Sequence, residues 1–203
     1  MGSEFEMSMM GELNFFLGLQ IKQNSNGTMI YQQKYAKKLI KKFKMEEPKE
    51  IDTPIATTTK LDIDEPGSSV DQKLYRGMIG SLLYLTASRP NIIFSVRLCA
   101  RFQANPKEFH LTAIKRILRY LKGTTDLYLW YPKGSNFNLV GYVDADYAGF
   151  IMDRKRTSGM AHLLVSCHVS WATKKQNSVA LSTAVAEYAA NASCFAQCGS
   201  NNG

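Results

Sequence analysis

The feature that most constrains the fold is an apolar strand that ends in aspartates and is followed by an acidic helix. The strand pattern covers Gly141–Val143 and continues into Asp144 and Asp146. The later stretch Leu181–Tyr188 predicts a helix with Glu187 in its first turns. A carboxylate at a strand end and a second one on the next helix can hold a divalent metal beside a phosphate. The sequence therefore predicts a sheet with a packed helix, and two metal ligands, Asp144 and Glu187.

These two carboxylates are only part of a metal site. A two-metal site holds its ions roughly 4 Å apart and needs three or four carboxylates, so two alone would bind Mg²⁺ weakly. By spacing alone, an Asp in a turn and a Glu on an exposed helix is the simpler interpretation of Asp144 and Glu187.

Basic charge is concentrated in the first two thirds of the chain. The formal net charge is +8, and 20 of the 25 Lys and Arg residues lie in residues 1–133, together with 13 of the 17 Asp and Glu residues. This distribution fits a polyanion partner such as nucleic acid, although solubility alone explains it equally well.

The first 50 residues predict a hairpin followed by a basic helix. Leu13–Gln23 and Thr28–Gln32 have the pattern of strands, and Asn26-Gly27 in the turn between them suits positive φ. An amphipathic helix follows from Gln33 to Met45, ended by Pro48. Its polar face is either simply solvated or contacts a nucleic-acid backbone, and it carries Lys34, Lys37, Lys38, Lys41, Lys42 and Lys44.

The middle of the chain predicts a linker and then helices. Ile51–Asp71 is polar and rich in turn residues, which indicates an extended and mobile loop. Apolar helices are expected over Asp71–Leu85 and Asn91–Phe102, with Arg89-Pro90 between them.

A further helix is marked at both ends, with Asn105 as its N-cap, Pro106 and Glu108 in its first turn, and Gly123 at its end. Its last turns are basic. These cations complement the helix dipole and could also contact phosphates: Lys115, Arg116, Arg119 and Lys122.

After Asp126 the pattern changes to strands. Strands are expected over Leu127–Tyr131, Phe137–Val143, Met160–Val165 and Val169–Thr173, the last two joined by a turn at Ser166–His168. A helix is expected from about Ser182 to Cys198.

Cysteine usage and apolar content indicate an intracellular chain. No run of 18 apolar residues and no secretory signal is present, so we expect the cytoplasm or the nucleus and no membrane association. Cys194 and Cys198 lie one helical turn apart, with His162 and His168 not far away in sequence. They could bind zinc, but small core residues on a helix explain the cysteines better, because no C-x-x-C knuckle is present.

Several longer motifs, in order along the chain, resemble the Pol polyprotein of copia-type LTR retrotransposons. Gly11–Leu19 and Tyr31–Tyr35 look like the end of the reverse transcriptase palm in that family. Tyr75–Leu85, Ser88–Ile92 and Ala113–Thr124 look like its thumb or connection region. The last third resembles the start of its RNase H domain through Asp144–Asp146, Asp153–Gly159, Val169–Trp171, Lys174–Gln176 and Ala186–Tyr188.

The resemblance implies an α+β fold in three parts. Residues 1–50 would be the end of the palm with the basic helix, and residues 51–133 the helical thumb or connection. Residues 134–203 would be a truncated RNase H-like α/β domain of about three strands and one helix.

The resemblance also implies roles for single residues. Asp144 and Glu187 match the first catalytic Asp and the catalytic Glu of RNase H, which would act with Mg²⁺ on an RNA–DNA hybrid. Trp171 is as good a candidate for the core as for a platform under the substrate.

The chain departs from the family in what it lacks. It contains no Asp-Asp dipeptide, so the paired polymerase aspartates are absent. The remaining RNase H aspartates and their parallel strands would lie beyond Gly203. Val185 and His168 stand where the family favours a Glu and a small turn residue.

Three functions remain open at this point. The first is a fragment of a reverse transcriptase and ribonuclease H polyprotein that is inactive as this chain. The second is a non-catalytic, basic nucleic-acid-binding module. The third is a decayed remnant without selected function, with a marginally folded segment at residues 134–203. Whether the chain is an enzyme is left undecided.

Overall fold

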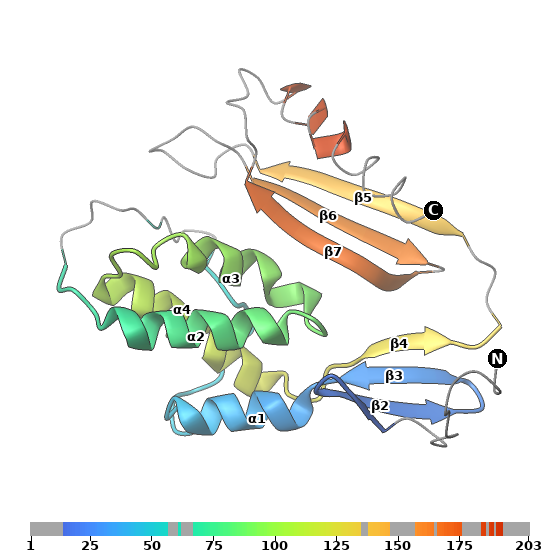
Figure 1. The fold of residues 1–203 in the computed structure, drawn as a ribbon, viewed down its shortest axis with the longest axis horizontal. Coiled ribbons are helices and arrows are strands. Elements are labelled where there is room, and N and C mark those ends of the chain that lie inside the picture. Colours follow the sequence, from blue (N-terminus) through green and yellow to red (C-terminus); the bar gives the residue numbers. More distant parts are fainter. Residues whose placement is uncertain are drawn as a thin grey trace, which may run out of the picture.

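The structure is a computed structural model in which two small antiparallel sheets lie beside a group of helices (Figure 1). It describes residues 14–56, 61, 67–134, 138–146, 157–164, 166–175, 184–185, 187–188 and 190–192. The predicted mixture of helices and strands is confirmed at this level, and both sheets are antiparallel.

The first sheet has the order β1-β2-β3-β4. β2 (Leu19–Asn24) and β3 (Gly27–Tyr31) form the predicted hairpin, which is confirmed. The prediction of one continuous strand over Leu13–Gln23 is wrong. A tight turn at Leu17-Gly18 separates the short strand β1 (Phe15–Phe16) from β2. Both turn residues have positive φ, 47° and 80°, which is the backbone that a two-residue hairpin turn requires.

The β2–β3 turn spans Asn24–Gly27, as predicted, although Asn26 does not have a positive φ. Asn24 pairs with Gly27, and the Asn24 side-chain oxygen accepts hydrogen bonds from the backbone N–H groups of Asn26 (3.0 Å) and Gly27 (2.9 Å). Gly27 is needed for a different reason, namely the close approach of β4 (Leu129–Pro132). A Cβ at Gly27 would lie 2.3 Å from the Tyr131 carbonyl oxygen.

β4 brings the chain back to the first sheet after all the helices. It pairs antiparallel with β3, from Gly27 opposite Pro132 to Ile30 opposite Leu129. The strand predicted at Leu127–Tyr131 therefore exists, with its start two residues later, and its partner is the N-terminal hairpin.

α1 (Gln33–Lys42) is shorter than the predicted helix, and Pro48 does not end it. Lys44 adopts a left-handed backbone with φ 54°. Its N–H bonds to the Lys41 carbonyl, and the Met45 N–H bonds to the Ile40 carbonyl at 2.8 Å. This pair of bonds is a Schellman motif, which satisfies carbonyls at the helix end, and Ile40 and Met45 are both buried beside it.

The apolar core lies among α1, α2 (Gln72–Leu85), α3 (Ile93–Ala100) and α4 (Glu108–Gly123). α2 begins as predicted, with the Asp71 carboxylate accepting from the Lys73 N–H at 2.8 Å. The short 3-10 helix η1 (Pro90–Ile92) leads into α3. Fully buried apolar side chains from these helices include Ile79, Leu82, Leu85, Ile92, Val96, Ile114, Ile117, Leu118 and Leu121.

The predicted start of α4 is wrong by two residues. The helix begins at Glu108 with Lys107 as N-cap, not at Pro106 with Asn105 as N-cap. The ring nitrogen Nδ1 of His110 accepts the Lys107 N–H at 3.0 Å, and the His110 ring stacks on Phe102 with centroids 3.9 Å apart. The buried His110 therefore bonds to the backbone of the N-cap residue Lys107, and Asn105 is not the N-cap as the sequence had suggested. The end at Gly123 is confirmed.

The second sheet has the order β5-β6-β7, formed by β5 (Leu139–Asp146), β6 (Thr157–Leu164) and β7 (Cys167–Lys175). The predicted strands are present but longer, and β5 continues through the aspartates expected in a turn. His168 pairs with Leu163 inside β7, so its predicted place in a turn is wrong.

Among the described residues, the second sheet is attached by hydrogen bonds to the end of α2 and to the first sheet, and α3 packs on β7. The Trp171 indole N–H donates to the Thr86 carbonyl at 2.9 Å, at the end of α2. The Tyr131 hydroxyl on β4 donates to the His168 carbonyl on β7 at 2.6 Å. Trp171 thus acts as a structural contact between the second sheet and the helices.

Several expectations lie wholly or partly outside the described residues. They include Gly11–Leu13, most of the linker at 57–66, residues 153–156, Gln176, and both Cys194 and Cys198. The predicted last helix is described only at 184–185, 187–188 and 190–192, which are helical. The division into parts at residues 50 and 133 stays a prediction. Among the described helices, none has the length and apolar character needed to cross a membrane.

Candidate nucleic-acid interface

Asp144 lies on β5 opposite Gly159 of β6, and its side chain is exposed. It lines one side of a mainly apolar pocket of about 590 Å³ between the second sheet and the chain around η1. Tyr142 on the same strand is 59% exposed, and Trp171 and Thr173 line the pocket from β7. The Asp144 carboxylate is therefore accessible from solvent, as a metal ligand must be.

Glu187 is also exposed and lies in the helical stretch, three residues before the fully buried Ala190. Carboxylate oxygens suit Mg²⁺, so the donor chemistry of Asp144 and Glu187 fits that ion. Their number does not fit a complete site, because the described part of the chain holds no group of three His, Cys, Asp or Glu side chains placed to bind a metal.

The predicted lysine surface on α1 is exposed. Lys37, Lys38, Lys41 and Lys42 all point away from the buried face formed by Ala36, Leu39 and Ile40. Lys34 extends this surface toward β1, where its ammonium lies 4.9 Å from the centre of the Phe15 ring. The helix thus presents a row of cations that a phosphate backbone could reach.

The basic residues of α4 are placed differently. The Arg119 Nε donates to the Lys49 carbonyl at 2.6 Å, and the Lys122 ammonium donates to the Glu46 carbonyl at 2.6 Å. Arg116 donates to the Thr53 hydroxyl at 2.8 Å. These three half-buried cations therefore hold the segment of residues 46–53 against α4, whereas Lys115 is exposed.

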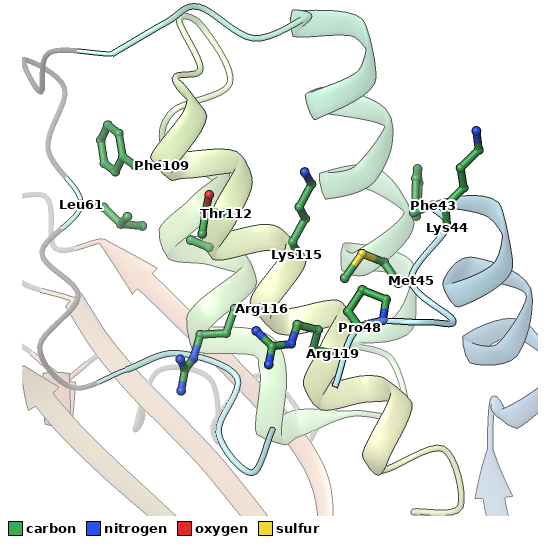
Figure 2. A pocket seen from close by; sticks show the side chains of 11 residues that line it. Phe43, Lys44, Met45, Pro48, Leu61, Phe109, Thr112, Lys115, Arg116 and Arg119 are labelled. Atoms are coloured by element: carbon green, nitrogen blue, oxygen red, sulfur yellow. The ribbon is translucent and has the colours of Figure 1, made fainter. Parts of the chain in front are cut away.

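A second pocket, of about 750 Å³, lies where this segment meets α4 (Figure 2). Its floor is apolar, with Phe43, Met45, Leu61 and Phe109 among its lining residues, and Lys115, Arg116 and Arg119 stand along α4 beside it (Figure 2). An apolar floor with a cationic wall suits a ligand that has both a flat apolar part and negative charge.

The sequence analysis did not identify Arg89 as a buried residue that bonds to the end of α4. Its side chain is 1% exposed, and one guanidinium nitrogen donates to the Thr124 carbonyl at 2.5 Å, at the end of α4. Burial lowers the pKa of this guanidinium, while Tyr120 and Asp126 act in the opposite direction. The adjoining Ser88 hydroxyl donates to the Gln32 side chain at 2.8 Å. The Arg89-Pro90 dipeptide between two apolar helices was the only sequence signal.

The two cysteines within the described residues do not support a zinc site. Cys99 is buried in the helical core, and Cys167 is half-buried at the start of β7. Burial raises the pKa of the Cys99 thiol to about 12, so the thiol stays protonated and unreactive at neutral pH.

Comparison with known proteins identifies the family. Residues 1–57 match the family model described as reverse transcriptase (RNA-dependent DNA polymerase). The chain is 38% identical over 177 residues, 87% of its length, to the retrovirus-related Pol polyprotein from transposon RE1 of Arabidopsis thaliana. It is 36% identical over 199 residues, 94% of its length, to the corresponding polyprotein from transposon TNT 1-94 of Nicotiana tabacum.

The coverage of these relatives is unequal. The chain spans only 12% and 15% of the two polyproteins. It spans 79% of an uncharacterized mitochondrial protein of Arabidopsis thaliana, to which it is 32% identical over 190 residues. No solved structure matches the chain at a significant level. Because the similarity extends from the reverse transcriptase match through both sheets, the chain belongs to the Pol polyprotein family of copia-type retrotransposons.

Proposed function

We propose that this chain is a nucleic-acid-binding part of a retrotransposon Pol polyprotein and has no polymerase or nuclease activity by itself. The observation that carries the proposal is the exposed row of lysines on α1, whose opposite face is buried in the core. Lysines on a rigid helix contact phosphates without reading the base sequence. The partner that this predicts is an RNA–DNA hybrid or another nucleic acid.

The second sheet is proposed to be the beginning of an RNase H-like domain. Three antiparallel strands followed by a helical stretch fit the order of elements that the family resemblance implies. The accessible Asp144 on β5 and the exposed Glu187 on the helix support the assignment of these two residues as metal ligands.

The chemistry of such a site depends on the groups that hold it. Asp144 and Glu187 would hold Mg²⁺, which when bound would activate water and stabilise the leaving oxygen of a phosphodiester. In this chain, Asp144 is presented by a strand whose register with β6 is fixed over its whole length, so its position is defined before any ligand binds. Two carboxylates leave most of the coordination to water, and we therefore expect weak metal binding and no cleavage.

Cleavage of a labelled RNA–DNA hybrid in Mg²⁺ or Mn²⁺ tests the inactivity. We expect no cleavage by the chain and the same result for Asp144→Asn. Cleavage that depends on the metal and disappears in Asp144→Asn would refute it, and would mean that further ligands come from residues not identified here or from a partner chain.

Salt-dependent binding to the same hybrid tests the lysine surface. We expect binding to weaken steeply between 50 and 200 mM salt, with a slope of log K against log[salt] that falls by about 0.9 for each lost phosphate contact. The test variant replaces Lys37, Lys38 and Lys41 by Gln, and a matched control replaces the exposed Lys22, Lys73 and Lys133. An equal slope change in both variants would show that only net charge matters and would refute a defined α1 surface.

A further inference from the structure

Thr53 lies on the segment that the cations of α4 hold in place. Its hydroxyl oxygen accepts a hydrogen bond of 2.8 Å from Arg116. The residue is exposed and lies in an irregular stretch of backbone, residues 51–56. It precedes Pro54, and this is the only place in the sequence where a Ser or Thr precedes a Pro.

Arg116 has unused hydrogen-bonding capacity at this point. Its Nε–H is buried and has no hydrogen-bond partner within the described part of the chain. A guanidinium has donors in a planar fork that matches two oxygens of a phosphate, whereas a hydroxyl satisfies only one of them. The Thr53 hydroxyl therefore accepts only one of the hydrogen bonds that the Arg116 guanidinium can donate.

The surroundings of Thr53 are arranged for negative charge. Arg119 and Lys122 bond to the backbone of the same segment, at Lys49 and at Glu46, so the segment lies along a row of cations. The segment itself is acidic, with Glu46, Glu47, Glu50 and Asp52. These carboxylates repel an added phosphate, so the α4 cations must outweigh them, and Figure 2 shows Arg116 and Arg119 near each other along the helix.

We propose that Thr53 is a phosphorylation site for a proline-directed serine/threonine kinase, and that Arg116 binds the resulting phosphate. The kinase would transfer the γ-phosphoryl group of ATP to the Thr53 hydroxyl oxygen. The bond from this oxygen to phosphorus forms, the bond from the γ-phosphorus to the β,γ-bridging oxygen breaks, the hydroxyl proton passes to the base of the kinase, and ADP leaves.

The modification has a structural consequence. The phosphate adds a charge of about −1.5 to −2 at neutral pH and three strong acceptor oxygens. Bonded to the oxygen that Arg116 already contacts, it supplies the second acceptor that the guanidinium lacks. It therefore ties residues 46–53 more firmly to α4.

The modification also has a regulatory consequence, which rests on the proposed nucleic-acid binding. Arg116 and Lys44, just after α1, line the same pocket, so a phosphate beside Arg116 lowers the positive potential next to the lysine surface of α1. Phosphorylation therefore weakens the binding of a polyanion to this side of the molecule.

The first test uses the full chain, ATP and a proline-directed kinase that is active on a standard substrate. A peptide of residues 47–56 is treated in parallel. We expect incorporation of one phosphate at Thr53, located by mass spectrometry, and none in Thr53→Ala. No incorporation into the chain would overturn the proposal, whether or not the peptide is modified: a modified peptide would mean that the fold hides Thr53, and an unmodified one that the sequence is not a substrate.

The second test separates the Arg116 contact from the modification itself. We expect phosphorylation to raise the Tm of the chain by about 2 to 4 °C, and to leave the Tm of Arg116→Gln unchanged. Arg97→Gln, at an exposed arginine on α3, is the matched control and should show the same rise as the unaltered chain. An equal rise in Arg116→Gln would overturn the role of Arg116.

The third test measures hybrid binding by the phosphorylated and unphosphorylated chains. We expect weaker binding and a smaller salt slope after phosphorylation. If the unphosphorylated chain does not bind the hybrid at all, the proposed function fails while the first two tests still decide the modification. Binding that is unchanged by a phosphate at Thr53 would overturn the regulatory step alone.

Discussion

At the scale of single residues, the role of a residue depends on its backbone conformation and on what packs against it, and its identity alone does not reveal that role. Lys44 adopts a left-handed backbone that only glycine adopts without strain, yet the residue present is a lysine. Gly27 is required by the approach of β4, which cannot be read from the turn in which it was expected to act.

Lys44→Gly should stabilise the chain. Removing the Cβ relieves the left-handed strain at the end of α1 and keeps the Schellman hydrogen bonds, so we expect the free energy of unfolding to rise by about 1 kcal/mol. Urea unfolding measures this change. Lys37→Gly, in the middle of the same helix, is the control and should lower the free energy by about 1 kcal/mol. A loss of stability in Lys44→Gly would contradict the strain argument.

Cys99 should resist alkylation in the folded chain. Burial raises its pKa to about 12 from an ordinary 9.0, and its neighbour Tyr75 donates a hydrogen bond to the Cys99 carbonyl at 2.8 Å. At pH 8, iodoacetamide should leave Cys99 unmodified until guanidinium is added, and should modify it after that. Peptide mapping by mass spectrometry decides this, and equal labelling of Cys99 in both states would contradict the buried position.

The same pKa shift gives a direction for stability against pH. In the folded chain the thiol keeps its proton, while in the unfolded chain it ionises near 9.0. The stability that this burial provides is therefore complete below about pH 9 and is lost as the pH rises toward 12.

At the scale of elements, α4 both closes the core and carries the cations that hold residues 46–53. The apolar stripe was visible in the sequence, but the contacts of Arg119 and Lys122 with carbonyls 70 and 76 residues away were not. The predicted phosphate contacts at Arg116, Arg119 and Lys122 stay predictions, and in the structure each of these side chains already has a partner within the chain.

Removing the two cations that hold this segment should expose it to proteolysis. In the double variant Arg119→Gln and Lys122→Gln, we expect a Glu-specific protease to cut after Glu46 or Glu50 several-fold faster. Global stability should fall by about 1 kcal/mol per lost contact, because both contacts are partly solvated. Lys115→Gln, at an exposed position of the same helix, is the control. Unchanged cleavage rates would show that the segment is held by other contacts.

At the scale of the whole molecule, hydrogen bonds of Trp171 and Tyr131 attach the second sheet to the rest of the described fold. The indole of Trp171 bonds to the end of α2, and the Tyr131 hydroxyl bonds to β7. Burial of Tyr131 raises the pKa of its phenol, which keeps this donor protonated over the physiological range. The Trp171 bond attaches the second sheet to the helices, and the Tyr131 bond attaches it to the first sheet.

Trp171→Phe should weaken the second sheet before it weakens the helical core. The substitution keeps an aromatic ring but removes the N–H donor, so we expect faster amide exchange in β5, β6 and β7 and little change in α2 and α4. Hydrogen exchange followed by mass spectrometry measures this difference. Tyr142→Phe, at an exposed position of the same sheet, is the control. Rapid exchange across residues 138–175 in the unaltered chain would instead favour a decayed remnant.

Most secondary structure could be predicted from the sequence because it depends on local patterns. The hairpin, the apolar stripes of α2 and α4, and the strands around Asp144 all follow from periodicity and turn residues. The ends of the helices were harder to predict. Hydrogen bonds of the Lys44 and Met45 N–H groups end α1 before Pro48 is reached. At the start of α4, the buried His110 bonds to the N-cap residue Lys107, and Asn105 is not the N-cap.

The candidate site was likewise predictable from the sequence only in part. The sequence by itself determined the exposed lysine face of α1 and the strand that carries Asp144, since both depend on the period of one element. Only the tertiary structure decided that β4 returns to the N-terminal hairpin, that Arg89 is buried, and that α4 turns three cations onto residues 46–53. Such contacts join residues far apart in the chain, and their energy depends on a geometry that no local pattern of residues contains.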